Sequence, residues 1–74
     1  MRPLTLLMKS VGSNVRLKLK DNSIYVGRLI ECDEHMNVIL QNAQEIIDEE
    51  KRIGYGKIFI RGNNILYIII SPGK

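Results

Sequence analysis

Cysteine and histidine, the residues that stabilise many small proteins through disulfides or bound metal ions, are nearly absent from this sequence. Its 74 residues include one cysteine, Cys32, and one histidine, His35. A lone cysteine cannot form a disulfide within the chain, and with one histidine it cannot complete a zinc site made of Cys and His. We therefore expect no metal ion and no cofactor. Because a core this small is marginal by itself, association with further subunits is the stabilising device that remains.

Long apolar runs are absent too. The longest, Ile65 to Ile70, falls far short of the roughly 20 residues that cross a bilayer. No basic segment followed by an apolar stretch opens the chain, as a secretory signal would require. We expect a soluble intracellular protein without membrane contact, cytoplasmic, or nuclear if its source is eukaryotic. A lone thiol suits such a reducing compartment.

Acidic residues are missing from both ends of the chain. All eight lie between positions 21 and 50, whereas every charged residue in segments 1–20 and 51–74 is basic. The net charge is +3. A fold that joins the two ends would have a basic side suited to a polyanion. A merely solvated surface explains the same pattern equally well.

What the sequence does contain is a series of short periodic segments. Pro3, followed by apolar residues at 4, 7 and 8 and then by Gly12, predicts a helix over residues 3–10. From Asn14 onward apolar and polar residues alternate, which is the period of a strand with one wet face. Turn residues divide this part into five predicted strands, at 14–20, 23–32, 36–46, 53–61 and 64–70.

This order predicts one domain over residues 1–74, mainly β, with a short helix ahead of a strongly bent five-stranded antiparallel barrel. Gly27, in the middle of a strand, indicates a bend or a close backbone approach. The last strand, Ile65 to Ile70, is apolar on both faces. Such a strand is either central in the sheet or covered by another subunit.

Two segments resemble a known family. Residues 14–43, which include VGRLIECDEHMNVIL, and residues 56–68, GKIFIRGNNILYI, are similar to the two motifs of the Sm and Sm-like (Lsm) proteins, with an acidic stretch between them. The resemblance implies an Sm-type barrel, which is SH3-like or OB-like, and a ring of most often seven subunits. In that ring the last strand would pair with the neighbour's strand near Lys57 to Arg61. The resemblance also implies binding of uridine-rich single-stranded RNA at the inner rim, in ribonucleoprotein assembly or RNA processing.

Transferred position by position, the resemblance places a uridine pocket at His35, Asn37 and Arg61. The residue types suit that task. An imidazole and a guanidinium plane can stack on the two faces of a base, and the Asn37 amide offers a donor and an acceptor to the uracil edge. A surface histidine, a solvated arginine and a turn-capping asparagine are the ordinary explanations for these residues taken singly.

Three more residues belong to this part of the resemblance. Gly62 is expected to allow a positive φ or a close approach at the turn. Asn63 stands where archaeal relatives often carry Asp, and we expect it to keep an orienting role toward Asn37 or Arg61. Asp33 is expected to support the turn or to meet Arg61 rather than to contact RNA.

Several alternatives stay open at this point. A homoheptamer of archaeal type is the first expectation, and a subunit of a mixed eukaryotic ring is the alternative. A ring that only binds proteins, with non-specific RNA affinity and a docking site at Asp48 to Glu50, is the competing function. Catalysis is not expected, because Cys32 and His35 lack an orienting third group. A second, less specific RNA surface competes with simple solvation, the commoner case, at Lys9, Arg16 and Lys18.

Overall fold

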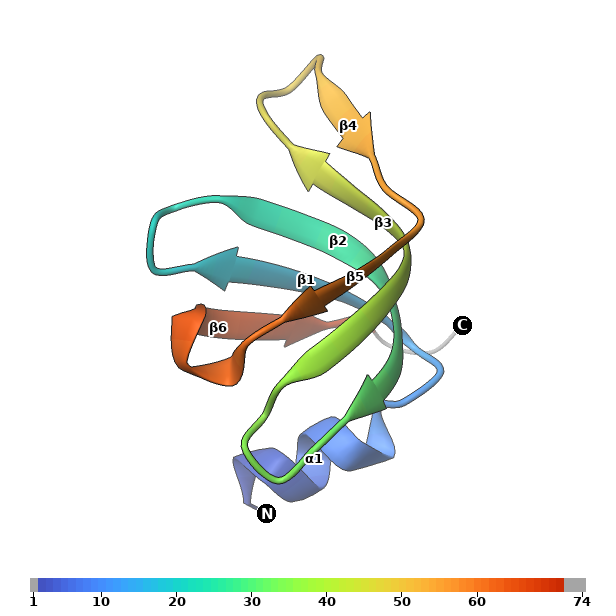
Figure 1. Cartoon of the computed structure of the whole chain (residues 1–74), viewed down its shortest axis with the longest axis vertical. Coiled ribbons are helices and arrows are strands. Elements are labelled where there is room, and N and C mark those ends of the chain that lie inside the picture. Colours follow the sequence, from blue (N-terminus) through green and yellow to red (C-terminus); the bar gives the residue numbers. More distant parts are fainter. Residues whose placement is uncertain (1, 72–74) are drawn as a thin grey trace.

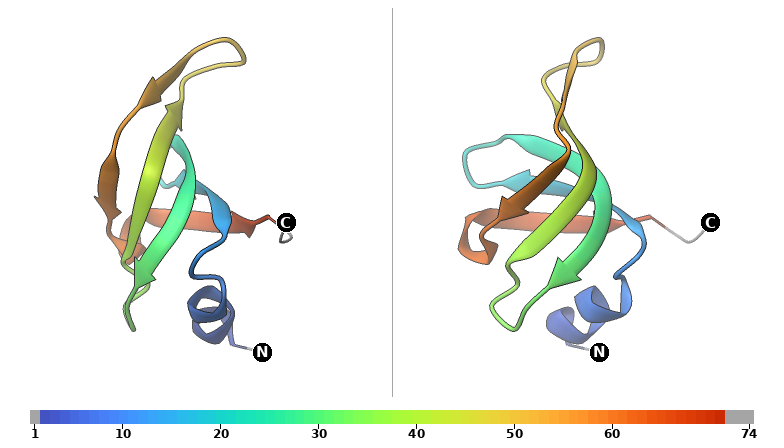
Figure 2. Two further views of the ribbon diagram at one scale, coloured as in Figure 1. Left: turned by 90° about the vertical axis from the view of Figure 1, so that its right-hand side faces the viewer. Right: turned by 45° about the vertical axis from the view of Figure 1, so that its right-hand side comes forward.

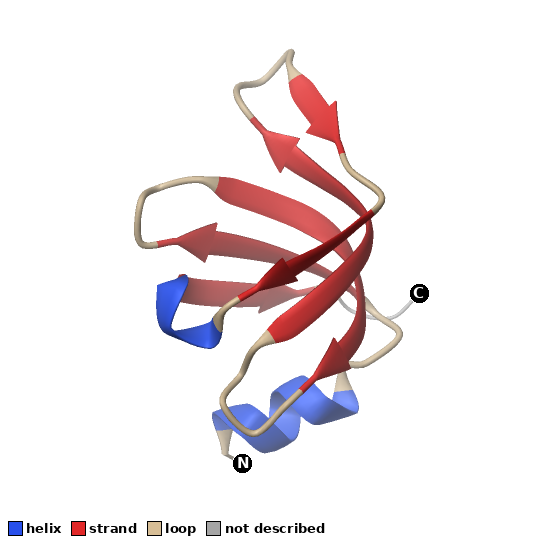
Figure 3. Ribbon diagram, viewed as in Figure 1, coloured by secondary structure: helices blue, strands red, loops and turns tan. Residues whose placement is uncertain are grey.

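The structure is a computed structural model, and it describes residues 2–71. A short helix lies at one end of the molecule, beside an antiparallel sheet that makes up most of the fold (Figures 1 and 3). In chain order the elements are α1 Pro3–Lys9, β1 Asn14–Leu19, β2 Ile24–Cys32, β3 Val38–Ile46, β4 Arg52–Gly54, β5 Lys57–Ile60, the 3-10 helix η1 Gly62–Asn64, and β6 Ile65–Ile70. No helix within residues 2–71 is long and apolar enough to cross a membrane.

The sheet has the order β4-β3-β2-β1-β6, and β5 also pairs with β3. Where the sequence predicts one strand over 53–61, the structure has two, because the regular pairing is interrupted at Tyr55 and Gly56, opposite Asn42 of the facing strand, whose φ is 54°. Both residues still bond to Ala43. The pairs Gln44↔Gly54 and Gln41↔Lys57 nevertheless continue one register along β3. β4 and β5 are thus a single interrupted strand, and counted in this way the strongly bent sheet has the five strands expected.

The sheet bends sharply at Gly27 in the middle of β2. A Cβ atom at this position would stand 3.2 Å from the Ala43 Cα atom and equally close to Leu40 and to the Gln41 carbonyl oxygen. The β2–β3 pairing shifts register between Val26 and Arg28, at Gly27 itself, and again between Leu29 and Glu31, as bulges in a strongly bent sheet do. Figure 2 shows β2 and β3 curving through the molecule in both turned views. The close approach predicted for Gly27 is therefore present.

The concave side of the sheet holds the core, and α1 closes one end of it. Leu7 is the buried residue of the helix. The helix ends at Lys9, one residue earlier than expected, where the Ser10 hydroxyl donates to the Leu6 carbonyl at 2.8 Å and Gly12 follows with a φ of 98°. The buried core residues are Leu7, Val15, Leu17, Leu29, Val38, Leu40, Ala43 and Ile60.

The two edges of the sheet are apolar and open. β6 pairs with β1 alone, so it is an edge strand and not the central strand that its sequence also allowed. Its Leu66 and Ile69 side chains are 56% and 51% exposed. On the other edge, Phe59 of β5 is 62% exposed. Unpaired apolar edges of this kind favour pairing with another chain.

Candidate functional site

The loop between β2 and β3 is built around one carboxylate. Asp33 Oδ1 accepts the backbone N–H groups of His35, at 2.9 Å, and of Asn37, at 3.0 Å. Its Oδ2 accepts the Asn37 side-chain amide at 3.0 Å. These hydrogen bonds favour the charged form, with that from the Asn37 side chain the strongest, and they lower the pKa of Asp33 below its ordinary value of 3.8. Asp33 therefore fixes the shape of the loop.

Asn37 ties this loop to a second loop that is distant in the sequence. Its Oδ1 accepts the backbone N–H of Gly62 at 2.7 Å. With Nδ2 donating to Asp33, the amide is held in one orientation at both ends. One N–H of Nδ2 and one lone pair of Oδ1 are left for a ligand. The chain reaches this position because Met36, just before, adopts a φ of 63°, which also delays the start of β3 from the expected residue 36 to Val38.

Gly62 allows the two loops to touch. A Cβ atom there would collide with the His35 carbonyl oxygen and would stand 2.8 Å from the carbonyl carbon and oxygen of Met36. Its φ is not positive, since the one glycine with that feature in the described chain is Gly12. Of the two reasons expected for glycine here, the close approach holds and the left-handed conformation does not. The loops at 33–37 and 61–64 form one unit.

His35 stands free above this unit. Its side chain is 75% exposed, and Nε2 lies 3.6 Å from a Glu34 carboxylate oxygen. A ring that is held only at its backbone, by Asp33, can turn its face to a planar ligand.

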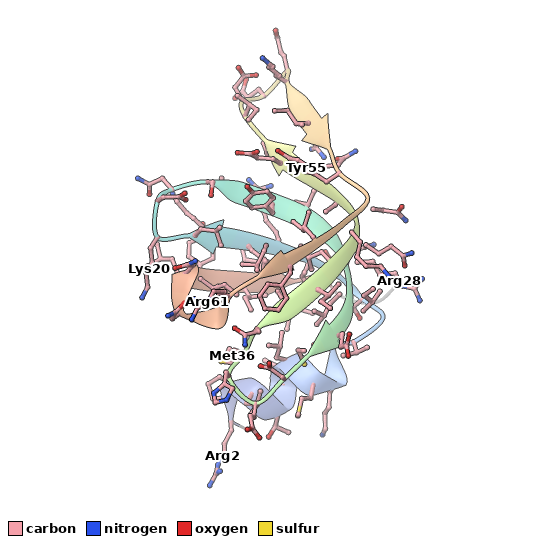
Figure 4. The ribbon with its side chains drawn as sticks, in the orientation of Figure 1. Arg2, Lys20, Arg28, Met36, Tyr55 and Arg61 are labelled. Atoms are coloured by element: carbon pink, nitrogen blue, oxygen red, sulfur yellow. The ribbon has the colours of Figure 1, made fainter. Side chains whose placement is uncertain are left out.

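Arg61 precedes η1 on the second loop and is exposed. It borders a cavity of about 330 Å³ together with Tyr25 and Tyr55. Figure 4 shows Arg61 and Met36 on neighbouring loops at the same part of the fold. Within residues 2–71 no ion pair joins Arg61 to Asp33, so of the two roles expected for Asp33 only the support of the turn is seen.

Asn63 makes no side-chain hydrogen bond to Asn37 or Arg61 in the described chain. It is exposed on η1. The orienting role expected for residue 63 is instead divided between Asp33, which holds the Asn37 amide nitrogen, and the Gly62 N–H, which holds its oxygen. The amide is thus oriented without any help from position 63.

Comparison with known proteins places this arrangement in a family. The LSM domain model matches residues 5–70. This chain belongs to the Sm and Sm-like family. The U6 snRNA-associated Sm-like protein LSm6 of Pyricularia oryzae is 40% identical over 70 residues, which are 95% of this chain and 84% of that protein.

Solved Sm structures share the fold over nearly the whole chain. The Pyrococcus abyssii Sm protein in complex with a uridine heptamer is similar with a TM-score of 0.89 at 42% identity, covering 96% of this chain and 100% of that one. The P. aerophilum SmAP1 heptamer gives a TM-score of 0.87 at 35% identity, with 96% and 95% covered. The bent sheet with an N-terminal helix is therefore the Sm fold.

One feature of this Sm-like chain was not evident from its sequence. Tyr25 and Tyr55 form an aromatic pair, with ring centroids 6.4 Å apart at 45°. The Tyr55 hydroxyl donates to Glu45 at 3.0 Å, and this bond to a carboxylate raises the pKa of Tyr55. The pair forms a wall of the cavity that Arg61 borders. Both tyrosines lie within predicted strands, at 23–32 and 53–61, and the sequence left the direction of the Tyr25 side chain undecided.

Proposed function

We propose that this protein binds uridine-rich single-stranded RNA at the inner rim of a homoheptameric ring, in ribonucleoprotein assembly or RNA processing, and that it does so without catalysis. The hydrogen bond from the Gly62 N–H to Asn37 Oδ1 carries the proposal, because it joins the two loops that hold His35, Asn37 and Arg61. The similar Pyrococcus abyssii protein, whose structure contains a uridine heptamer, supports the ligand class.

The chemistry of the joined loops suits uracil. The free Asn37 N–H can donate to a uracil carbonyl oxygen while the free Oδ1 lone pair accepts the uracil N3–H. Cytosine has an acceptor at N3, so the second bond would be lost. His35 and Arg61 are exposed enough to stack on the two faces of the base, each such stack being worth about 1–3 kcal/mol. The pocket would therefore distinguish uracil by hydrogen bonds to the edge of the base and would hold it by stacking on its two faces.

Ring formation follows from the two open edges. We propose that β6 of each subunit pairs with β5 of its neighbour, which would cover Leu66, Ile69 and Phe59 and leave no free edge in a closed ring. The P. aerophilum SmAP1 heptamer, which has this fold, supports seven subunits. The whole chain would act as one Sm-like domain, and an intracellular location, cytoplasmic or nuclear, follows from an RNA partner.

The test is binding of heptameric oligo-U, oligo-A and oligo-C, measured by fluorescence anisotropy at physiological salt, where purely electrostatic affinity is suppressed. We expect a mass of seven chains by light scattering and a clear preference for oligo-U. Arg61→Gln should weaken oligo-U binding by about tenfold or more, given about 1–3 kcal/mol per stacked base. Arg52→Gln removes the same charge from β4 and serves as the matched control.

Three results would each overturn a part of the proposal. Equal and salt-sensitive binding of all three oligonucleotides would leave only non-specific RNA affinity, and a scaffold that docks proteins would then be the better explanation. Equal losses for Arg61→Gln and Arg52→Gln would remove Arg61 from the pocket. A monomer that forms a ring only with added relatives would replace the homoheptamer by a mixed ring.

A further inference from the structure

The outer, convex side of the sheet carries a group of basic side chains away from the joined loops. Side chains alternate between the faces of a strand. Val15 and Leu17 of β1 point into the core, so Arg16 and Lys18 lie on the outer face. Leu29 of β2 is also buried in the core, which places Arg28 on that same outer face. Figure 4 shows Arg28 projecting from the outside of the bend, on the opposite side of the view from Arg61.

The strand register brings these residues together. Arg16 pairs with Val26, and Arg28 lies two residues further along β2. Arg16 and Arg28 are therefore diagonal neighbours, about 7–8 Å apart in such a sheet. Across the next strands Arg28 pairs with Gln41, and Gln41 with Lys57 of β5. We call this surface the convex basic face, and its residues are Arg16, Lys18, Arg28, Gln41 and Lys57.

Several of the carboxylates lie away from the convex basic face. Asp33 is held in its loop, Glu45 accepts the Tyr55 hydroxyl, and the acidic run at residues 48–50 lies at the tip of the β3–β4 hairpin. Glu31, at the far end of β2 beside Ile39, does share the outer face. Within residues 2–71 no carboxylate lies within ion-pair distance of any cation of the convex basic face.

An unneutralised group of this kind has a cost, because like charges that are neighbours in a sheet repel each other. A bound polyanion would offset that repulsion. The face offers only hydrogen-bond donors and an amide, which are the groups that contact phosphate and sugar oxygens in nucleic-acid complexes. β1 and β2 are interior strands of the sheet, so pairing of subunits through the outermost strands leaves their outer face open.

We propose that the convex basic face binds the sugar–phosphate backbone of single-stranded RNA, as a second contact surface that does not read the bases. It goes beyond the uridine pocket and does not depend on it. The cations of this face would contact only the phosphate backbone of the RNA. They could do so whether or not bases of the same RNA are bound at the joined loops. Affinity for long RNA should therefore exceed that for an oligonucleotide that only fills the pocket.

The test compares two variants of the full chain that lose the same charge. Arg28→Gln alters the convex basic face, and Lys51→Gln alters an exposed cation at the hairpin tip. Binding is measured from low to high salt with a uridine heptamer and with the same heptamer extended by a long oligo-A tail. For the tailed RNA we expect the first variant to flatten the dependence of log K on log salt by about 0.7 for each phosphate that the face no longer neutralises.

The heptamer alone should bind both variants like the wild type, with the subunit mass of the assembly unchanged. Identical salt dependence of the two variants on the tailed RNA would overturn the proposal. So would competition by polyglutamate that matches competition by RNA, because it would mark a site for an acidic protein. If the wild type shows no preference for uridine while the first variant still flattens the salt dependence, the uridine pocket fails and the convex basic face stands.

Discussion

The two loops at the ends of β3 are built in opposite ways. The loop before it, residues 33–37, is held by three hydrogen bonds to the Asp33 carboxylate and by the link from Asn37 to Gly62. The hairpin tip after it, residues 47–51, is exposed throughout, and its one side-chain bond joins Asp48 to the Glu50 N–H. The hairpin extends away from the rest of the molecule in Figure 1.

The difference shows that the geometry is fixed at the loop of residues 33–37 and not at the hairpin tip. A site that distinguishes one base from another needs its donors and acceptors held to within a fraction of an ångström. The loop at 33–37 meets that need, because its residues are tied both to each other and to a loop 25 positions away. The charged side chains of the hairpin tip are exposed and share one side-chain hydrogen bond, which suits tolerance of change rather than recognition of a small planar ligand.

The largest expected effect comes from adding one methyl group at the contact between the loops. Gly62→Ala would drive a Cβ atom into backbone atoms of His35 and Met36, which cannot move without breaking the Asn37 link. We expect the free energy of unfolding to fall by about 1–3 kcal/mol, as overpacking usually costs, and oligo-U binding to fall more than tenfold. Thermal unfolding and anisotropy measure the two losses.

The matched control is Gly54→Ala, at the hairpin. A Cβ atom there meets nothing within 4 Å, so its stability should stay within about 0.5 kcal/mol of the wild type and its RNA affinity should not change. Equal behaviour of the two alanine variants would show that the contact at Gly62 gives way easily. The loop before β3 would then be no less tolerant of substitution than the hairpin after it.

A smaller effect is expected from a change of one atom in the anchoring carboxylate. Asp33→Asn keeps an oxygen for the backbone N–H groups but turns an amide toward the Asn37 amide nitrogen, so that two donors face each other. Asn37 should then lose its fixed orientation. We expect oligo-U affinity to fall by about tenfold, since hydrogen bonds to a charged acceptor are the stronger ones, with little change in oligomer mass.

Asp48→Asn makes the same chemical change at the hairpin tip. The Asp48 side chain accepts a single backbone N–H, from Glu50, and an asparagine oxygen can accept it equally well. Its RNA affinity should match the wild type. An Asp33→Asn protein that binds oligo-U as tightly as the Asp48→Asn protein would mean that the orientation of Asn37 does not depend on the carboxylate.

Local patterns predicted most of the fold. The alternation that begins at Asn14 and the turn at Asp21 to Ser23 are properties of neighbouring residues, and β1 and β2 lie where those patterns place them. The turn is closed by the Asp21 carboxylate, which accepts both the N–H and the hydroxyl of Ser23. Such contacts between residues two apart are visible in a sequence.

The features that escaped prediction depend on distant partners. The link from Asn37 to Gly62 joins residues 25 apart. Half of the hydrogen-bonding groups of the Asn37 amide, which the sequence analysis assigned to the base, are used within the protein. The break between β4 and β5 depends on their pairing with β3, where the Tyr55 N–H reaches the Ala43 carbonyl at 2.7 Å. The site residues themselves came from resemblance to the family's motifs, since no local pattern distinguishes His35 from any other loop histidine.

The smallest expected effect is a loss of stability at low pH. It would show whether protonation of Asp33 removes the hydrogen bonds that distinguish the loop at 33–37 from the hairpin tip. Because its pKa is lowered on folding, Asp33 contributes stability that is fully present above 3.8, its ordinary value, and that is lost as the pH falls through the lower pKa of the folded protein. A carbon-detected NMR titration of the Asp33 carboxyl should give a midpoint below 3.8, with the Gly62 amide signal moving at the same pH. In the Asp33→Asn protein that movement of the Gly62 signal should be absent. A carboxyl midpoint at or above the ordinary value would mean that the three hydrogen bonds do not favour the charged form, and that the loop at 33–37 is held by its backbone alone.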